Sequence, residues 1–182
     1  PWPSIARTIW GNHNRYKETY FSTFENKYFT GDGALRDEVG YYRITGRVDD
    51  VIIVSGHNLG TAPIEDAINE HPAVAESAIV GFPHDIKGSA LYGLITPKDI
   101  GETRNHENVR KEINQLITDR IGPIAKLDKI QFTNGLPKTR SGKIMRRILR
   151  KIACNETDQL GDTSTLLNEE VVKEIFDNSL IK

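Results

Sequence analysis

A basic segment of the chain, residues 136–152, has the residue types and spacing to bind an anion. Residues 138–151 contain seven lysines or arginines and no acidic residue. We expect Lys143 to lie where a glycine-containing loop meets the N-terminus of a helix, because backbone N–H groups and the helix dipole favour a phosphate or carboxylate there. A solvated basic helix with a flexible loop explains the same pattern, and the residues alone leave both interpretations open. The buried face of that helix would carry three isoleucines, Ile144, Ile148 and Ile152.

Two further segments could contact a nucleotide or another anion. Asp32 lies between two glycines, where its carboxylate could accept hydrogen bonds from the vicinal hydroxyls of a ribose or could cap a turn. Arg47 precedes two acidic residues at positions 49 and 50, and this group could form an anion-binding hinge or a salt-bridged linker. The residues alone leave these alternatives open.

Residue types and spacing exclude several classes of site. No two of the five histidines have the spacing of metal ligands, and His71 before Pro72 is typical of a helix end. The chain has neither the Gly-x-Ser-x-Gly motif nor the glycine spacing of a P-loop, which argues against a serine hydrolase and a P-loop nucleotidase. The single cysteine, Cys154, excludes an internal disulfide and fits a reducing compartment, so we expect a cytoplasmic protein.

Hydropathy and charge exclude further partners. The longest aliphatic run covers only residues 51–54, whereas a membrane-spanning helix needs about 20 apolar residues. The first 30 residues also lack the apolar core of a signal peptide, so we expect neither membrane insertion nor secretion. A net charge of −1 argues against a nucleic-acid partner, because residues 155–182 carry seven acidic residues that balance the basic segment.

The remaining sequence predicts an α+β domain that positions these residues. A β-hairpin is expected over residues 34–45, and Thr61 and Asn168 are candidate N-caps of two helices. The expected strands cover residues 51–55, 76–82, 90–96 and 129–133, and the expected helices cover residues 62–68, 106–121 and a segment after 168. The only methionine is Met145 and the first 30 residues have more aromatic side chains than they can bury, so we expect a piece of a longer protein.

In this order and at these spacings, the motifs resemble the adenylate-forming enzymes, and among them the AMP-forming acetyl-CoA synthetases. The matching segments are residues 28–32, 40–42, 44–50, 54–57, 137–153 and 161–166. The resemblance implies that residues 1–48 end a large N-terminal domain that is otherwise missing. Residues 49–182 would then be the small mobile C-terminal domain, a short mixed sheet flanked by helices, with its hinge at Asp49.

The resemblance also implies a reaction and its residues. Acetate and ATP would form acetyl-adenylate and pyrophosphate, and CoA would then release AMP, with Mg²⁺ as the cofactor. Lys143 matches the adenylation lysine of the family, which an acetyltransferase and a deacetylase would regulate. Asp32 matches the ligand of the ribose hydroxyls and Arg47 an ATP-binding arginine. The piece alone would be inactive.

Five further positions receive roles from the resemblance. Ser55 and Gly56 match residues that line the CoA tunnel. A magnesium ion would be held by carbonyl and imidazole ligands at three positions, Asn69, His71 and Val74.

The sequence departs from the family where an arginine is usual. Asn58 replaces an arginine that faces the ATP phosphates, and Thr118 replaces one that faces the CoA phosphates, with Arg120 as a possible substitute. Two other functions stay open. The protein could be a propionyl-CoA synthetase, because the acyl pocket would lie elsewhere, or a stand-alone binding module that presents Lys143 to a modifying enzyme.

Overall fold

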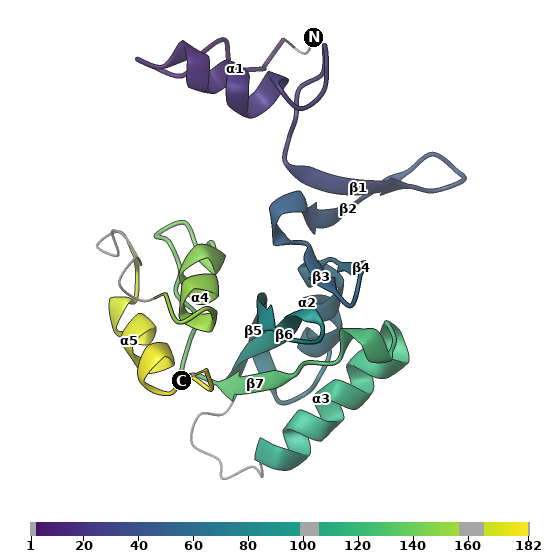
Figure 1. The fold of residues 1–182 in the computed structure, drawn as a ribbon, viewed down its shortest axis with the longest axis vertical. Coiled ribbons are helices and arrows are strands. Elements are labelled where there is room, and N and C mark those ends of the chain that lie inside the picture. The colour runs from purple at the N-terminus through teal and green to yellow at the C-terminus, as the bar shows by residue number, and fades with distance from the viewer. Residues whose placement is uncertain (1–2, 99–105, 157–165, 182) are drawn as a thin grey trace. The chain divides into compact units, whose positions relative to one another are not determined.

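A computed structural model describes residues 3–98, 106–156 and 166–181 of the chain (Figure 1). The chain divides into two compact units, Pro1–Asp49 and Asp50–Lys182. The division falls directly after Asp49, whose role as a hinge stays a prediction. In the part of the chain that is described, no helix has the length and apolar character to cross a membrane.

The first unit contains a helix and a two-stranded antiparallel sheet. Helix α1 spans His13–Phe21, and strands β1 (Asp32–Arg36) and β2 (Tyr42–Arg47) pair as the expected hairpin. The carboxylate of Asp37 closes the hairpin turn by accepting hydrogen bonds from two backbone N–H groups, those of Gly40 and Tyr41. Large apolar side chains stay exposed on this unit, namely Trp10, Leu35, Val39, Tyr41, Tyr42 and Ile44.

The second unit is built on a mixed five-stranded sheet, one strand more than the four that the sequence predicts, because residues 57–59, expected in a loop, form β4. Its strands are β3 (Ile52–Val54), β4 (His57–Leu59), β5 (Val74–His84), β6 (Gly88–Pro97) and β7 (Lys129–Phe132). Strand β6 is central, because it pairs antiparallel with β5 and β3 and parallel with β7, while β4 extends the sheet beyond β3. Strand β5 therefore forms one edge of the sheet.

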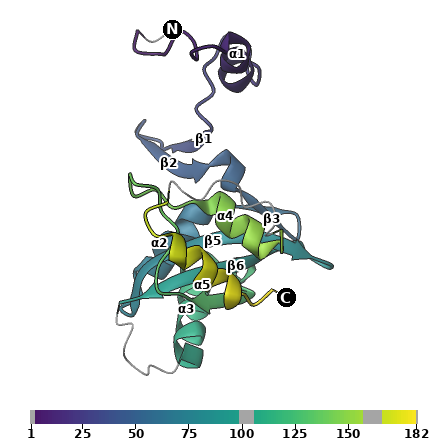
Figure 2. The same ribbon diagram turned by 90° about the vertical axis from the view of Figure 1, so that its left-hand side faces the viewer.

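Helices cover both faces of this sheet (Figure 2). Helices α2 (Thr61–Asn69) and α3 (His106–Arg120) pack on one face around Ile79, Leu91 and Ile95. Helices α4 (Arg146–Ala153) and α5 (Glu169–Asp177) pack on the other face around Val80, Tyr92 and Leu94. Neighbouring residues of β5 and β6 thus enter opposite cores, as the period of a strand requires. Two 3₁₀ turns complete the described elements, η1 (Val48–Asp50) and η2 (Pro123–Ala125).

The expected strands and helices of this unit are confirmed, but of the two capping predictions one is wrong and the other is confirmed only in position. Helix α2 begins at Thr61 itself and has Gly60 at its N-cap, so the Thr61 cap is wrong. Asn168 does occupy the N-cap position of α5, yet its side chain makes no hydrogen bond to that helix. Of the motif at residues 161–166, only Leu166 lies among the described residues.

Candidate functional site

Lys143 lies in a tight turn that precedes helix α4. The N–H of Thr139 donates to the carbonyl of Lys143 (2.9 Å), and the N–H of Gly142, whose φ is +82°, donates to the carbonyl of Thr139 (2.8 Å). The N–H of Lys143 is occupied as well, because it donates to Thr139 Oγ1 (3.2 Å). The Lys143 side chain is exposed and forms no hydrogen bond or ion pair with any residue that the structure describes.

The predicted place of Lys143 at a helix N-terminus is wrong. Helix α4 begins only at Arg146, with Met145 at its N-cap, and Ile144 instead forms an antiparallel β-bridge with Lys138. Lys143 is therefore at the end of a small hairpin rather than on the helix. An anion at Lys143 would be bound by the ammonium group and not by the amides beside it, because the N–H of Lys143 donates to Thr139 Oγ1 and that of Met145 to the carbonyl of Pro137.

Asp32, Arg47 and Asp49 lie together in the first unit. Asp32 and Arg47 are directly opposite each other in the β1–β2 pair, and Arg47 Nη1 is 3.7 Å from Asp32 Oδ1. Arg47 Nε donates to Asp49 Oδ1 at 2.9 Å. All three side chains are about half exposed, and ion pairs of this kind contribute only about 0–1 kcal/mol to stability.

Ser55 and Gly56 form the two-residue turn between β3 and β4. Both have positive φ, +49° and +81°, which is the conformation of a type I′ hairpin turn. The N–H of Ser55 donates to the carbonyl of Lys87 (2.9 Å), which ties this turn to the β5–β6 hairpin. A Cβ at Gly56 would meet no atom within 4 Å, so this turn is open to a ligand. Figure 1 shows it well apart from the loop before α4 that carries Lys143.

The positions where an arginine was expected have different surroundings. Asn58 is exposed on β4 opposite Ile53. The side chain of Thr118 forms a hydrogen bond within its own helix, because its Oγ1 donates to the carbonyl of Asn114 (2.7 Å). Arg120, the possible substitute, pairs with Glu70 at 2.5 Å. Neither position on α3 therefore presents an unpaired cation.

A cluster of charged residues joins α4 to the rest of the second unit, and the sequence analysis missed it. Arg146 Nη2 donates to Glu65 Oε2 (2.6 Å), and Arg150 Nη2 donates to Asp50 Oδ1 (3.0 Å). Glu65 is only 7% exposed, and its Oε1 accepts the N–H of Ile79 on the edge strand β5 (2.8 Å). Burial raises the pKa of Glu65, and the Ile79 N–H and Arg146 offset only part of this effect.

Asp50 contacts both arginines of this cluster. Its side chain is 12% exposed, and its Oδ2 lies 3.9 Å from Arg146 Nε. The first residue of the second unit is thus fixed to α4 by two arginines. No short motif in the sequence marks this arrangement, because about 100 residues separate the partners.

The positions of the expected magnesium site do not fit a cation bound through the imidazole. His71 Nδ1 accepts the N–H of Ala73 (3.2 Å), and His71 Nε2 contacts Glu112 Oε2 (3.0 Å), so neither ring nitrogen is available. The side chain of Asn69 accepts a hydrogen bond from Ser77. Within residues 3–98, 106–156 and 166–181, no three His, Cys, Asp or Glu side chains form a metal-binding group. The set Asn69, His71 and Val74 stays a prediction from the resemblance.

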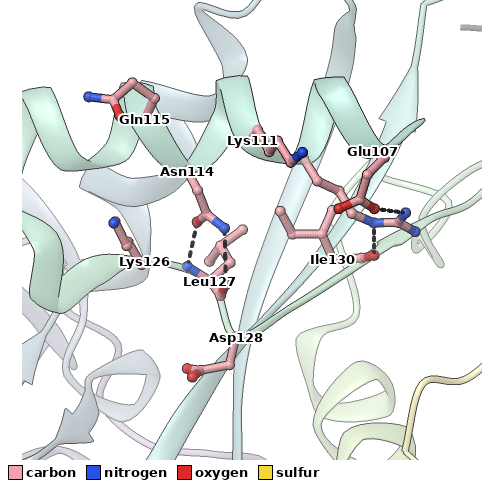
Figure 3. Close-up of a pocket in the computed structure, with 9 residues that line it drawn as sticks. Glu107, Lys111, Asn114, Gln115, Lys126, Leu127, Asp128 and Ile130 are labelled. Atoms are coloured by element: carbon pink, nitrogen blue, oxygen red, sulfur yellow. Dashed lines mark hydrogen bonds and ion pairs between the residues drawn. The ribbon is translucent and has the colours of Figure 1, made fainter. Parts of the chain in front are cut away.

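A pocket of about 430 Å³ lies between α3 and the segment that leads into β7 (Figure 3). The side chain of Asn114 crosses it and makes two hydrogen bonds with the backbone of Leu127, one to the carbonyl (3.2 Å) and one from the N–H (2.8 Å). Arg110 Nε donates to the carbonyl of Ile130 (3.1 Å). None of the predicted site residues lines this pocket, and its polar contacts are structural.

Comparison with known proteins assigns the family. Residues 63–143 match the family model of the AMP-binding enzyme C-terminal domain. The chain is 61% identical over 179 residues to the acetyl-coenzyme A synthetase of Pseudoalteromonas translucida, and 60% identical over 177 residues to that of Syntrophobacter fumaroxidans. These alignments cover 98% and 97% of this chain but only 27% of each relative, so the chain spans about a quarter of their length.

A solved structure agrees with this assignment. The anthranilate CoA ligase AuaEII, in complex with anthranoyl-AMP, is similar with a TM-score of 0.71 at 28% identity, over 83% of this chain and 28% of that one. The mixed α and β fold expected from the sequence is the fold of such enzymes. Residues 63–143 therefore belong to the AMP-binding enzyme C-terminal domain, and nearly the whole chain is about 60% identical to the C-terminal part of acetyl-coenzyme A synthetases.

Proposed function

We propose that the full-length protein is an AMP-forming acetyl-CoA synthetase and that residues 49–182 act as its small mobile domain. The observation that carries the proposal is the identity of about 60% to acetyl-CoA synthetases over nearly the whole chain. The substrates would be acetate, CoA and ATP, the last as its magnesium complex, and the reaction would take place in the cytoplasm. The chain alone would bind at most part of the substrates, since the rest of the relatives' length would supply the remaining site.

Lys143 would act in the first half-reaction. A carboxylate oxygen of acetate attacks the α-phosphorus of ATP, the bond from that phosphorus to the leaving oxygen breaks, and pyrophosphate departs. Negative charge is shared between the carboxylate and the α-phosphate, so an ammonium group at that point lowers the barrier. An exposed lysine on a hydrogen-bonded turn, with no competing partner among the described residues, is suited to this role.

Asp32 and Arg47 would hold the nucleotide in the first unit. The carboxylate of Asp32 can accept hydrogen bonds from the ribose hydroxyls, and the guanidinium of Arg47 can turn from Asp32 and Asp49 toward a phosphate. The exposed ion pairs that these residues form supply this flexibility, because solvent screens them.

The Ser55–Gly56 turn would act in the second half-reaction. The sulfur of CoA attacks the carbonyl carbon of acetyl-adenylate, the bond from that carbon to the phosphate oxygen breaks, and AMP departs. The open backbone at Gly56 lets the pantetheine chain approach closely. Rotation about Asp49 would exchange this turn for the Lys143 turn, because the two lie apart on one unit.

Modification of Lys143 would regulate the first half-reaction. Acetylation removes the charge of the ammonium group, and the exposed position of Lys143 gives an acetyltransferase and a deacetylase access to it.

The test is to replace Lys143 by alanine in the full-length protein and to measure the two half-reactions separately. We expect acetate-dependent exchange between pyrophosphate and ATP to be lost, while thioester formation from supplied acetyl-adenylate continues. The matched control is Lys126→Ala, which removes another exposed lysine of the same unit and should leave both rates unchanged. Undiminished exchange in Lys143→Ala would refute the proposal.

A further inference from the structure

Asn168 holds one arm of the hairpin that carries Lys143. Its Nδ2 donates to the carbonyl of Leu136 (3.0 Å), and its Oδ1 accepts the N–H of Lys138 (3.2 Å). The side chain thus bonds the backbone on both sides of Pro137, as a neighbouring strand would. This accounts for the absence of a side-chain cap on α5, because both polar atoms of Asn168 are used by the hairpin.

The residues before Asn168 continue this pairing along the same arm. The N–H of Leu167 donates to the carbonyl of Lys138 (2.9 Å), and Leu166 forms an antiparallel bridge with Thr139. Leu166 is buried in the core between α4 and α5, which fixes the segment to the body of the second unit. Residues 166–168 therefore act as a third strand beside the hairpin.

The other arm of the hairpin leads directly into α4. The N–H of Met145 donates to the carbonyl of Pro137 (2.8 Å), and Ile144 pairs with Lys138. Beyond this base, residues 140–143 are exposed. The position of Lys143 thus depends on how the base is held, by α4 on one side and by residues 166–168 on the other. Lys138 adds an ion pair with Glu76 of β5 (2.5 Å).

We propose that Asn168 is a positioning residue for Lys143 in the adenylation half-reaction. The inference rests on the proposed function and extends it to a residue that touches no substrate. Displacement of a reacting group by about 1 Å can lower a rate by about 10²-fold. Loss of both Asn168 hydrogen bonds would leave this arm held on that side by the Leu167 N–H and the Leu166 bridge alone, and would widen the range of positions open to Lys143.

The test uses the full-length enzyme with Asn168 replaced by alanine. We expect acetate-dependent pyrophosphate exchange to fall by about 10- to 100-fold in kcat, while thioester formation from supplied acetyl-adenylate stays within about twofold. Asn168→Asp keeps an acceptor for the Lys138 N–H but loses the donor, so its exchange rate should lie between those of alanine and asparagine. Asn178→Ala is the matched control. It removes an exposed asparagine at the other end of α5, whose Nδ2 bonds the Glu174 carbonyl.

Hydrogen exchange of the backbone separates positioning from general damage. The amide of Lys138 should exchange faster in Asn168→Ala, whereas the amide of Ile79 in β5 should not change. If the pyrophosphate exchange rate of Asn168→Ala lay within twofold of that of Asn178→Ala, the inference would be overturned. An equal loss of both half-reactions in Asn168→Ala would overturn it as well. If Lys143→Ala retained pyrophosphate exchange, the proposed function itself would fail. The results for the Asn168 variants test only the positioning role and cannot refute the proposed function.

Discussion

Replacement of Glu65 by alanine removes the hydrogen-bond acceptor of a backbone N–H group in the edge strand β5. Glu65 Oε1 accepts the N–H of Ile79, a fully buried residue of the edge strand β5. In Glu65→Ala this N–H has no partner. Glu65→Gln keeps an amide oxygen for the Ile79 N–H, but it removes the negative charge and replaces Oε2, the acceptor of Arg146 Nη2, by an NH₂ group that cannot accept. The two variants therefore separate the hydrogen bond to β5 from the ion pair with Arg146.

The expected sizes follow from the surroundings of the carboxylate. A buried donor without a partner costs about 1–3 kcal/mol, and loss of a buried methylene adds about 0.8 kcal/mol, so Glu65→Ala should destabilise by about 2–4 kcal/mol. Glu65→Gln should cost less, about 1 kcal/mol at pH 7, because the hydrogen bond from Arg146 is lost while the desolvation of the buried charge is relieved. Burial raises the pKa of Glu65, so the pair with the 26%-exposed Arg146 does not fully offset the desolvation of the charge.

The pH dependence gives a second test with a fixed sign. Because the pKa of Glu65 in the folded state is raised above its ordinary value of 4.5, the folded protein binds this proton more tightly than the unfolded chain. The contribution of Glu65 to stability is therefore fully present below 4.5 and is lost as the pH rises through the folded pKa. Glutamine does not titrate, so the wild type should gain stability relative to Glu65→Gln as the pH falls from 7 toward 4.5.

Urea unfolding followed by circular dichroism measures these differences in the second unit, which holds most of the described helices and strands. Tryptophan fluorescence would report on the first unit instead, because both tryptophans lie there. Glu70→Ala is the control, since the pair of Glu70 with Arg120 is more than half exposed and should contribute less than about 1 kcal/mol. If Glu65→Gln cost as much as Glu65→Ala, the reasoning on the Ile79 hydrogen bond would be refuted.

Two further substitutions test packing and hydrogen bonding in the second unit, and one assay tests the activity of the chain alone. Gly93→Ala places a Cβ 2.5 Å from Leu127 Cδ1 and should destabilise by about 1–3 kcal/mol in the same unfolding assay; an unchanged midpoint would contradict the tight packing. Asn114→Ala loses both hydrogen bonds to the Leu127 backbone and should cost about 1–3 kcal/mol, with faster amide exchange at Leu127. The 182-residue chain alone should catalyse no pyrophosphate exchange, and measurable exchange would show that it holds a complete site.

The sequence predicts helices and strands correctly where the spacing of apolar residues matches the face that is buried in the core. The β-branched and apolar runs of β5 and β6 and the spacing of Val109, Ile113 and Ile117 in α3 determine which face is buried, and these elements are confirmed. The predicted start of α4 is wrong for a related reason. Ile144 has helical spacing to Ile148 and is partly buried against the same core, so periodicity alone assigns it to the helix.

Contacts between segments that are distant in the sequence determine features that the hydrophobic pattern does not predict. The amides of Lys143 and Met145 find acceptors in residues 137 and 139, which makes a hairpin more favourable than an earlier helix turn. Asn168 has the residue type of an N-cap, yet its side chain bonds residues 136 and 138 instead. The pairing of Asp50 with Arg150 depends on the complete fold, and no local signal in the sequence could reveal it.

We expect the full-length protein to form an acyl-adenylate from acetate. The most direct test supplies acetate labelled with ¹⁸O in both carboxylate oxygens, together with ATP and CoA, and measures the mass of the nucleotide product. Attack of acetate on the α-phosphorus and later cleavage between the carbonyl carbon and the phosphate oxygen would transfer one labelled oxygen to each AMP. Unlabelled AMP, or ADP in its place, would show that acetate does not attack the α-phosphorus and that no acyl-adenylate forms.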